Sequence, residues 1–254
     1  MEPRYQKPFI KEAIIRVDFS PENQVTDGFV EGDFAAANRN RYPNVEPRVQ
    51  VGQEFLFGPD GMSQKKVETR EWQLFGPERD RRILLGNAAL VVSVTAYTRW
   101  PDLKSDFIRA LDALAAHFPK AQVTRLGVRY INFVSIKEPN PFDWEGWIDA
   151  RLTSALTFPV DPKRTTRSMH VLELEYPEDV RLKYQFGVPN PDYPAPVKQK
   201  HFVMDMDASA SRILDTGEVK GLLEPMHDSI KALFEASIGD NLRAKMGVLT
   251  HDES

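Results

Sequence analysis

The sequence has no cysteine among its 254 residues. A chain without cysteine has no disulfide framework, no thiol nucleophile, no iron–sulfur cluster and no zinc site built on thiolates. This absence removes the small disulfide-stapled scaffolds and the thiol-dependent enzymes from the classes of protein to consider.

The sequence also lacks a strong excess of charge of either sign. Its 33 Lys and Arg residues nearly balance its 37 Asp and Glu residues, which leaves a formal net charge of −4. A mildly acidic chain is not a general binder of polyanions. Because 41% of the residues are hydrophobic and 10% are aromatic, we expect a globular protein rather than a disordered one.

Long hydrophobic runs are missing as well. The longest apolar run covers residues 88–92, whereas a membrane helix needs about 18–20 such residues. The first residues carry no apolar core of a secretory signal, because charged side chains interrupt them. We therefore expect a cytoplasmic protein that does not enter a membrane.

Motifs of the common catalytic and cofactor sites are absent from the sequence. It contains no P-loop, no GxGxxG and no GxSxG nucleophile elbow. Its five histidines form no HxH or HExxH pattern. We therefore predict no metal, no cofactor and no catalytic residue. Whether the protein is an enzyme stays open, with the balance against it.

The hydrophobic pattern predicts an α+β fold, with one or two mainly antiparallel sheets and helices that cover them. The clearest helix is expected at residues 101–117, and a long one at 217–240, where Pro225 predicts a kink or a late start. Weaker helices are expected at 27–41, with Asp27 as the N-cap, and at 143–156. Strands are predicted at residues 10–19, 47–57, 64–75, 81–85, 88–97, 121–136, 166–176, 180–188 and 199–208.

The order of these elements suggests an internal duplication. Each half of the chain reads as a strand, a helix, about three strands and a second helix. We divide the chain into a first α+β half at residues 1–119 and a second at 120–254, packed together as one domain or as two. Residue identities do not support the duplication, so an irregular α+β fold is the alternative.

The first strand of each predicted half mixes charge into apolar surroundings. Glu12 lies in the first strand and Arg129 in the strand at 121–136. Desolvating an unpaired charge costs several kcal/mol, so each needs a partner or water. If the two strands lie side by side at the centre, Glu12 and Arg129 form either a buried ion pair, which we favour, or part of a ligand site.

Other charged residues are expected to lie on solvated surfaces. Asp205 and Asp207 share one face of their strand, which we interpret as answering Arg181 and Lys183 rather than as a metal site. Short basic clusters are interpreted as ordinary loops, with contacts to nucleic acid as the alternative. These clusters comprise Arg39 and Arg41; Arg79, Arg81 and Arg82; and Lys163, Arg164 and Arg167.

Three segments of the sequence carry a resemblance to a known family: PFIKEAIIRVDF, RLGVRYINFVSI and MHDSIKALFEASIGDNLRAKMG. In them the chain resembles a sporadically distributed family of prokaryotic proteins of this length, for which no activity is established. The resemblance implies no particular chemistry, and the family's patchy distribution suggests a link to mobile or defence genes. The residues that match its motif are Glu12, Arg129, Tyr130, Asn132, His227, Asp228, Phe234 and Glu235. The first six are our candidate binding residues.

Three functions remain as hypotheses. The first is a non-enzymatic accessory or regulatory protein that binds a protein partner, in a defence or toxin–antitoxin setting, with the proline-rich loop at 188–198 as a docking element. The second is a small-ligand-binding protein or enzyme, with a pocket between sheet and helices lined by Glu12, Arg129 and Tyr130. The third, which we do not favour, is a nucleic-acid-binding factor.

Overall fold

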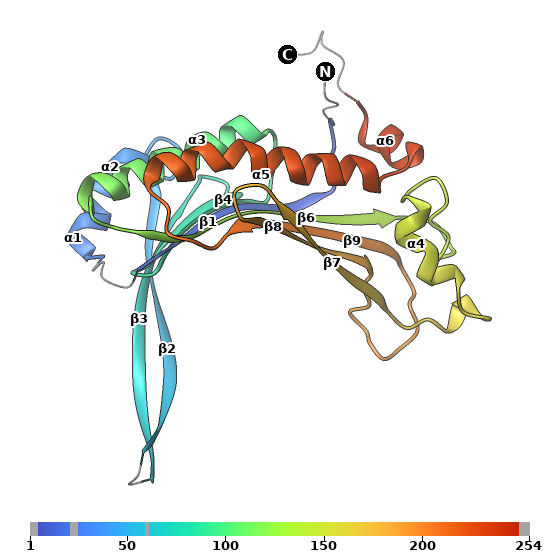
Figure 1. Cartoon of the computed structure of the whole chain (residues 1–254), viewed down its shortest axis with the longest axis horizontal. Helices are drawn as coiled ribbons and strands as arrows, with labels where there is room; N and C mark the ends of the chain where they lie inside the picture. The colour runs from blue at the N-terminus through green and yellow to red at the C-terminus, as the bar shows by residue number, and fades with distance from the viewer. Residues whose placement is uncertain (1–4, 21–24, 59–60, 249–254) are drawn as a thin grey trace.

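The computed structural model describes residues 5–20, 25–58 and 61–248, with the backbone alone for residues 50–69 and 162. Nine antiparallel strands form one sheet in the order β2-β3-β4-β5-β1-β6-β9-β8-β7. Helices α3 and α5 lie over the same face of this sheet (Figure 1). The predicted α+β class is thus confirmed, with one sheet rather than two. The strands are β1 (Ile10–Phe19), β2 (Asn44–Gly58), β3 (Gly61–Phe75), β4 (Arg81–Leu85), β5 (Ala89–Val94), β6 (Val123–Ile136), β7 (Ser168–Tyr176), β8 (Val180–Val188) and β9 (Lys200–Ala210).

The helical segments are short except for α3 and α5. Within the described residues, no helix is both long and apolar enough to cross a lipid bilayer. The segments are α1 (Asp27–Phe29), the π-helical η1 (Val30–Phe34), α2 (Ala35–Asn38), α3 (Trp100–His117), α4 (Ala150–Thr157), the 3-10 turn η2 (Pro162–Arg164), α5 (Thr216–Ser237) and α6 (Asp240–Met246).

Helix α5 begins before Pro225, so the late start that Pro225 suggested is wrong. The side chain of Asp215 accepts a hydrogen bond from the backbone of Glu218, and the Glu218 side chain accepts one from the backbone of Asp215. This capping box stabilises the first turn. Val219 and Leu223, which precede Pro225 on α5, are both buried. Packing of this kind offsets the loss of the backbone hydrogen bond that proline cannot donate.

Two other helix starts differ from the prediction. The helix expected from residue 143 begins at Ala150, because Gly146 has a φ of +71°, which interrupts a right-handed helix. The first helix is capped by Thr26 and not by Asp27, since the Thr26 side chain accepts a hydrogen bond from the Phe29 backbone.

Strands β1 and β6 lie side by side at the centre of the sheet, the arrangement that the sequence analysis considered for Glu12 and Arg129. Ile14 is opposite Arg129 in their antiparallel register. Outward from this pair, the first half continues as β5, β4, β3 and β2, and the second as β9, β8 and β7. The first strand therefore neighbours the last one in both halves. This common order is compatible with the duplication and with a boundary near residue 120, both of which stay predictions.

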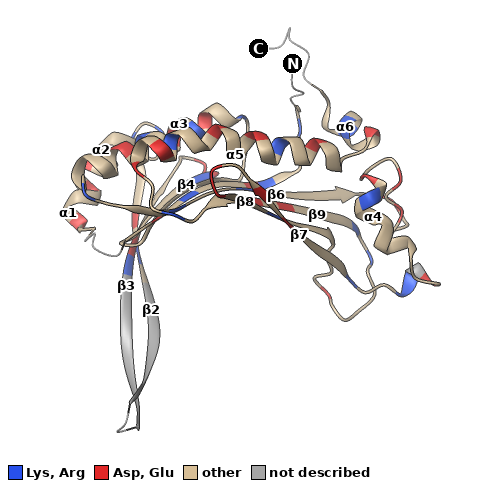
Figure 2. Cartoon of the chain, viewed as in Figure 1, with Lys and Arg blue, Asp and Glu red and all other residues tan. Residues whose placement is uncertain are grey.

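Alternation along the strands separates an apolar face from a charged one. On the face covered by α3 and α5, side chains such as Val128, Met204 and Leu182 are buried. The opposite face, which we call the open face, carries residues of both charge signs on the central strands (Figure 2). The hairpin of β2 and β3 extends beyond this sheet (Figure 1), because β4 pairs only with the end of β3 at residues 72–75.

A buried carboxylate ties α3 to the segments around it. Asp106 is fully buried and accepts a hydrogen bond of 2.9 Å from the Tyr42 hydroxyl. The guanidinium groups of Arg109, Arg41 and Arg81 lie 3.0, 3.2 and 3.9 Å from it. Burial, with the Asp106 charge beside it, raises the pKa of Tyr42 well above its usual value. The cluster supplies the partners that a buried charge requires.

Candidate functional site

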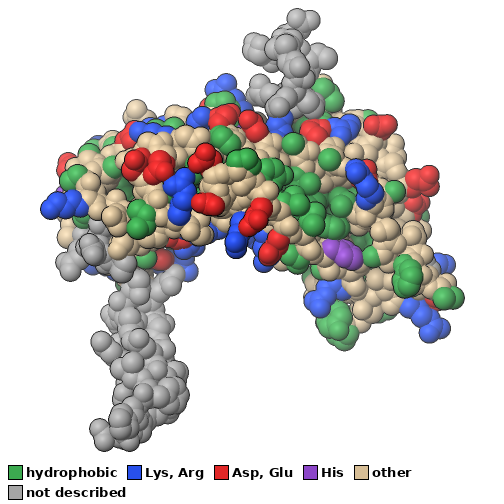
Figure 3. All heavy atoms as spheres, viewed as in Figure 1, with side chains coloured by type: hydrophobic (Ala, Val, Ile, Leu, Met, Phe, Trp, Pro, Cys, Tyr) green, Lys and Arg blue, Asp and Glu red, His purple; other side chains and the backbone are tan. Residues whose placement is uncertain are grey.

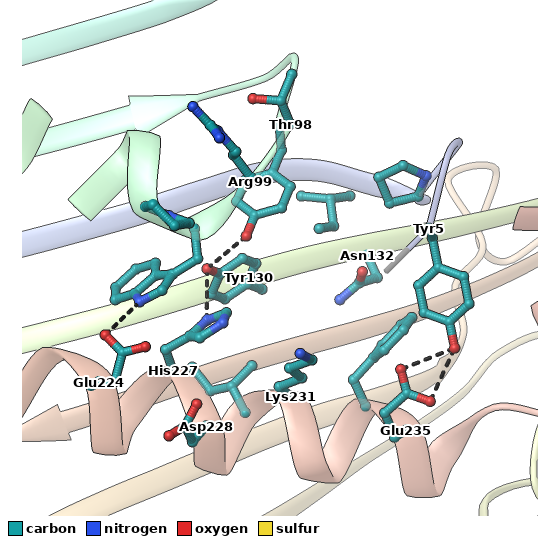
Figure 4. A pocket seen from close by; sticks show the side chains of 17 residues that line it. Tyr5, Thr98, Arg99, Tyr130, Asn132, Glu224, His227, Asp228, Lys231 and Glu235 are labelled. Atoms are coloured by element: carbon teal, nitrogen blue, oxygen red, sulfur yellow. Dashed lines mark hydrogen bonds between the residues drawn. The ribbon is translucent and has the colours of Figure 1, made fainter. Parts of the chain in front are cut away.

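A pocket of about 420 Å³ lies between α5 and the sheet. Strand β6, the loop before α3 and the N-terminal segment that leads into β1 complete its walls. Four of the six candidate residues line it: Tyr130, Asn132, His227 and Asp228 (Figure 4). The fold therefore brings together residues that lie almost a hundred positions apart in the sequence.

Local periodicity explains how each element presents its residues. Tyr130 and Asn132 are two positions apart on β6, so they share the face toward α5. On α5, Glu224, His227 and Asp228 follow a spacing of three or four residues, which places them on one side of the helix. Lys231 and Glu235 continue the same line (Figure 4).

A chain of hydroxyl and imidazole groups lies at one end of the pocket. The Tyr130 hydroxyl lies 3.0 Å from His227 Nδ1 and 3.4 Å from the Tyr97 hydroxyl. The Trp100 indole stacks on the His227 ring, with centroids 4.4 Å apart and an angle of 7° between the planes. Tyr130 is 4% exposed, and burial raises its pKa well above the usual value. The hydroxyl therefore stays protonated and can donate a hydrogen bond.

The Glu224 carboxylate at this end of the pocket is neutralised by Lys104, which does not line the pocket. Glu224 accepts hydrogen bonds from the Trp100 indole at 3.1 Å and from Lys104 at 2.5 Å. The Lys104 bond is the main reason why the pKa of Glu224 is lowered. Glu224 is therefore ionised and fixes the orientation of the indole.

The other end of the pocket is closed by the N-terminal segment. Tyr5 donates to Glu235, with its hydroxyl 3.0 Å from both carboxylate oxygens, and Arg243 of α6 pairs with the same carboxylate. Burial and Glu235 together raise the pKa of Tyr5 to about 12. Backbone hydrogen bonds of 2.9 Å from Gln6 to Gly247 and 3.0 Å from Lys7 to Met246 attach the segment to the end of α6.

The other two candidates, Glu12 and Arg129, lie on the open face and not in the pocket. Arg129 makes a two-pronged salt bridge to Asp205, at 2.8 and 2.6 Å, while Glu12 lies 4.0 Å from Arg82. The expected pair of Glu12 with Arg129 is therefore replaced by a pair across β6 and β9. In the register, Glu12 and Asp205 lie on either side of Ile131, so both are diagonal neighbours of Arg129. Arg129 pairs with Asp205 of the two.

The predicted partners of Asp205 and Asp207 are found only in part: Lys183 lies opposite Asp207, but Asp205 pairs with Arg129. Asp207 lies 3.3 Å from Arg125 rather than bonding to Arg181, which pairs with Glu175 instead. Burial raises the pKa of Asp207, although Arg125 opposes this effect. The pair of carboxylates belongs to an ion-pair network on β6 and β9, as expected of a structural role.

Sequence reasoning missed the groups that close the pocket. Tyr5, Tyr97, Trp100 and Glu224 line the pocket but are not among the candidate residues that the sequence analysis names. One available signal was the polar stripe on the helix predicted at 217–240, since Glu224 and Lys231 flank His227 at helical spacing. The N-terminal and loop contributions have no comparable periodic signal.

No protein-family model matches the chain, and no curated protein matches it in sequence. Within the described residues, no three His, Asp or Glu side chains converge in a way that could hold a metal ion. The geometry of the pocket is therefore the basis for a functional argument.

Proposed function

We propose that this protein binds a small organic molecule in the pocket between α5 and β6. The observation that carries the proposal is the convergence of Tyr130, Asn132, His227 and Asp228 on one cavity of about 420 Å³. Volumes of this order, about 300–1,000 Å³, are typical of small-molecule sites. We place this activity in the cytoplasm, as the sequence analysis predicts.

The composition of the walls supports the proposal. Nine of the seventeen lining residues are aromatic, aliphatic or proline, and the remainder are polar. Ligand sites combine an apolar wall, which supplies affinity, with a few placed polar groups, which supply orientation. His227 and Asn132 are such groups, because Tyr130 and the Met204 carbonyl fix their side chains at 3.0 and 3.2 Å.

A variant that obstructs the pocket from its rim tests the proposal. Thr98 lines the pocket and is exposed, so Thr98→Trp adds bulk at the opening without disturbing the core. Small molecules that raise the melting temperature of the wild type should lose this effect in the variant. Ala96→Trp is the matched control, since Ala96 is exposed in the same loop and does not line the pocket. Compounds that stabilise all three proteins equally would contradict the proposal.

The accessory-protein hypothesis is the second candidate, and the open face of the sheet favours it. The central strands present ion pairs there, and the hairpin of β2 and β3 extends beside them (Figure 1). A defence or toxin–antitoxin setting belongs to this proposal through the resemblance alone. Lys183→Glu reverses an exposed charge opposite Asp207 and should abolish co-purification of a stoichiometric partner from the native host. Lys245→Glu on α6 should retain it, and absence of any such partner from the wild type would count against the hypothesis.

The nucleic-acid alternative has less support. Arg79 pairs with Glu46, Arg81 lies next to Asp80, and Arg164 pairs with Asp161. Over the coloured part of the surface in this view, which leaves out the residues drawn in grey, acidic and basic side chains are intermixed (Figure 3). Phosphate binding depends on cations that are free to replace counterions. Retention on DNA or RNA that falls steeply with salt would restore this alternative.

A further inference from the structure

The charges around the pocket cancel one another. Three carboxylates line it, those of Glu224, Asp228 and Glu235, together with two cations, Arg99 and Lys231. The ion-pair partners of these lining residues, Asp102, Lys104 and Arg243, bring the set to four charges of each sign. Basic and acidic residues likewise alternate along α5 (Figure 2). The pocket therefore offers neither a surplus cation for an anionic ligand nor a surplus carboxylate for a cationic one.

These charges are also already engaged within the protein. Arg99 lies 2.7 Å from Asp102, and Lys104 lies 2.5 Å from Glu224. Asp228 and Lys231 have interaction partners of their own. A charged ligand would have to separate an existing pair in order to be neutralised, which gives up the attraction within that pair. An uncharged ligand meets no such cost.

Flat groups form much of the remaining wall. The indole of Trp100 and the imidazole of His227 lie parallel, and Tyr97 meets Tyr130 edge to face, with centroids 5.4 Å apart. Phe234 contributes a further ring at the other end of the pocket. Aromatic walls favour planar ligands, which gain stacking and edge contacts in addition to burial.

Polar atoms in the middle of the pocket provide both kinds of hydrogen-bonding group. The Asn132 amide donates to the Met204 carbonyl at 3.2 Å, which fixes its orientation and points the side chain into the pocket (Figure 4). Lys231 supplies donors near Asn132, and Asp228 supplies acceptors farther along α5, below His227 (Figure 4). A ligand group that is both donor and acceptor, such as a carboxamide, matches this arrangement.

We infer that the ligand is an uncharged, planar aromatic molecule with a hydrogen-bonding group of the carboxamide type. This inference rests on the proposed ligand-binding function and adds the class of ligand to it. The decisive features are the aromatic walls and the balance of charge between the lining residues and their ion-pair partners. A nucleotide, a polyamine or an organic acid lies outside this class, because each brings a net charge.

Three probes of nearly the same shape separate the classes of charge. Indole-3-acetamide is neutral, indole-3-acetate is an anion and tryptamine is a cation. Titrations followed by calorimetry should show the amide binding at least tenfold more tightly than either charged probe. Equal or tighter binding of the acid or the amine would overturn the inference, and so would failure of all three to bind.

Single-charge variants sharpen the test. Asp228→Asn leaves the lining residues and their ion-pair partners with one surplus cation and should improve binding of the acid relative to the amide. Lys231→Met should improve binding of the amine in the same way. Lys220→Met on α5 is the matched control, because Lys220 pairs with Asp112 outside the pocket and should leave the ranking of probes unchanged. Rankings that do not respond to the two pocket variants would count against a balanced site.

The Thr98→Trp variant distinguishes failure of this inference from failure of the proposed function. If a charged probe binds best and Thr98→Trp abolishes that binding, the pocket is a ligand site and only the class of ligand is wrong. If no molecule in a broad library shows binding that Thr98→Trp removes, the proposed function is wrong as well.

Discussion

Removing the hydroxyl of Tyr130 tests the hydrogen-bond chain that orders the pocket. In Tyr130→Phe the buried ring remains, and only the atom that lies 3.0 Å from His227 Nδ1 and 3.4 Å from the Tyr97 hydroxyl is lost. The change therefore isolates the hydrogen bonds from the packing of the side chain.

The expected cost follows from these two distances. A good neutral hydrogen bond contributes about 0.5–1.5 kcal/mol, and the 3.4 Å contact adds little. His227 lines a pocket, so water can replace the lost partner, and we expect a loss of about 1 kcal/mol in the free energy of unfolding. For a chain of this size, that loss lowers the melting temperature by roughly 2–4 °C.

The protonation state of the His227 ring gives a readout that a loss of packing would not change. Because the Tyr130 hydroxyl stays protonated, we expect it to donate to Nδ1 and to hold the imidazole proton on Nε2. Nitrogen-15 NMR should show an unprotonated Nδ1 in the wild type and a shifted Nδ1 signal in Tyr130→Phe. A proton on Nδ1, or an unchanged signal in the variant, would refute this reasoning.

Tyr184→Phe is the matched control for this experiment. The Tyr184 hydroxyl donates to Ser237 at 3.0 Å inside the core, so its removal should cost a similar amount of stability. It lies outside the pocket lining and should leave the His227 signals in place. A comparable spectral change in both variants would show that the signal reports general loosening rather than one hydrogen bond.

Three further predictions concern stability. Asp106→Ala should cost about 3–5 kcal/mol in urea unfolding, because it leaves three partly buried cations and the buried Tyr42 hydroxyl without their shared acceptor. Asp112→Ala, at an exposed position, should cost less than about 1 kcal/mol. Equal costs would show that the cluster is solvated. Tyr5→Phe should reduce the loss of stability above pH 10. The pKa of Tyr5 is raised to about 12 in the folded protein, so the wild type loses the Tyr5 contribution as the pH rises from the unfolded to the folded pKa. Identical pH profiles of the two proteins would contradict this. Gly187→Ala should destabilise the hairpin of β7 and β8, since Gly187 has a φ of +141° and a Cβ there would lie 2.0 Å from a backbone oxygen. Gly221→Ala in α5 should instead stabilise the protein by about 0.5–1 kcal/mol. The opposite order of melting temperatures would contradict both expectations.

The sequence predicts much of the secondary structure because alternation and helical spacing report which face is buried. Residues 10–19, 81–85 and 180–188 are strands with the predicted bounds, and the last of these pairs with the strand before it as a hairpin. The errors arise where one backbone angle or one cap decides, as at Gly146 and Thr26. Such features depend on a single residue and leave no periodic pattern.

The candidate site was predictable only in part, for a related reason. Tyr130 and Arg129 are adjacent in the sequence, and a strand sends adjacent side chains to opposite faces. One of them therefore lines the pocket, and the other pairs with Asp205 on the open face. Tyr5 and Trp100 reach the pocket through contacts with Glu235 and Glu224, far away in the sequence. No local pattern encodes those contacts.

The floor and the rim of the pocket differ in how firmly they are held. Tyr130 and Asn132 lie on β6, which pairs along its length with β1 on one side and β9 on the other. The rim consists of exposed residues such as Thr98 and of the segment that Tyr5 attaches to α6 through a few hydrogen bonds. Local opening is easiest where few contacts must break. We therefore expect the proposed ligand to enter by displacing the rim, while the fixed floor sets which ligand fits.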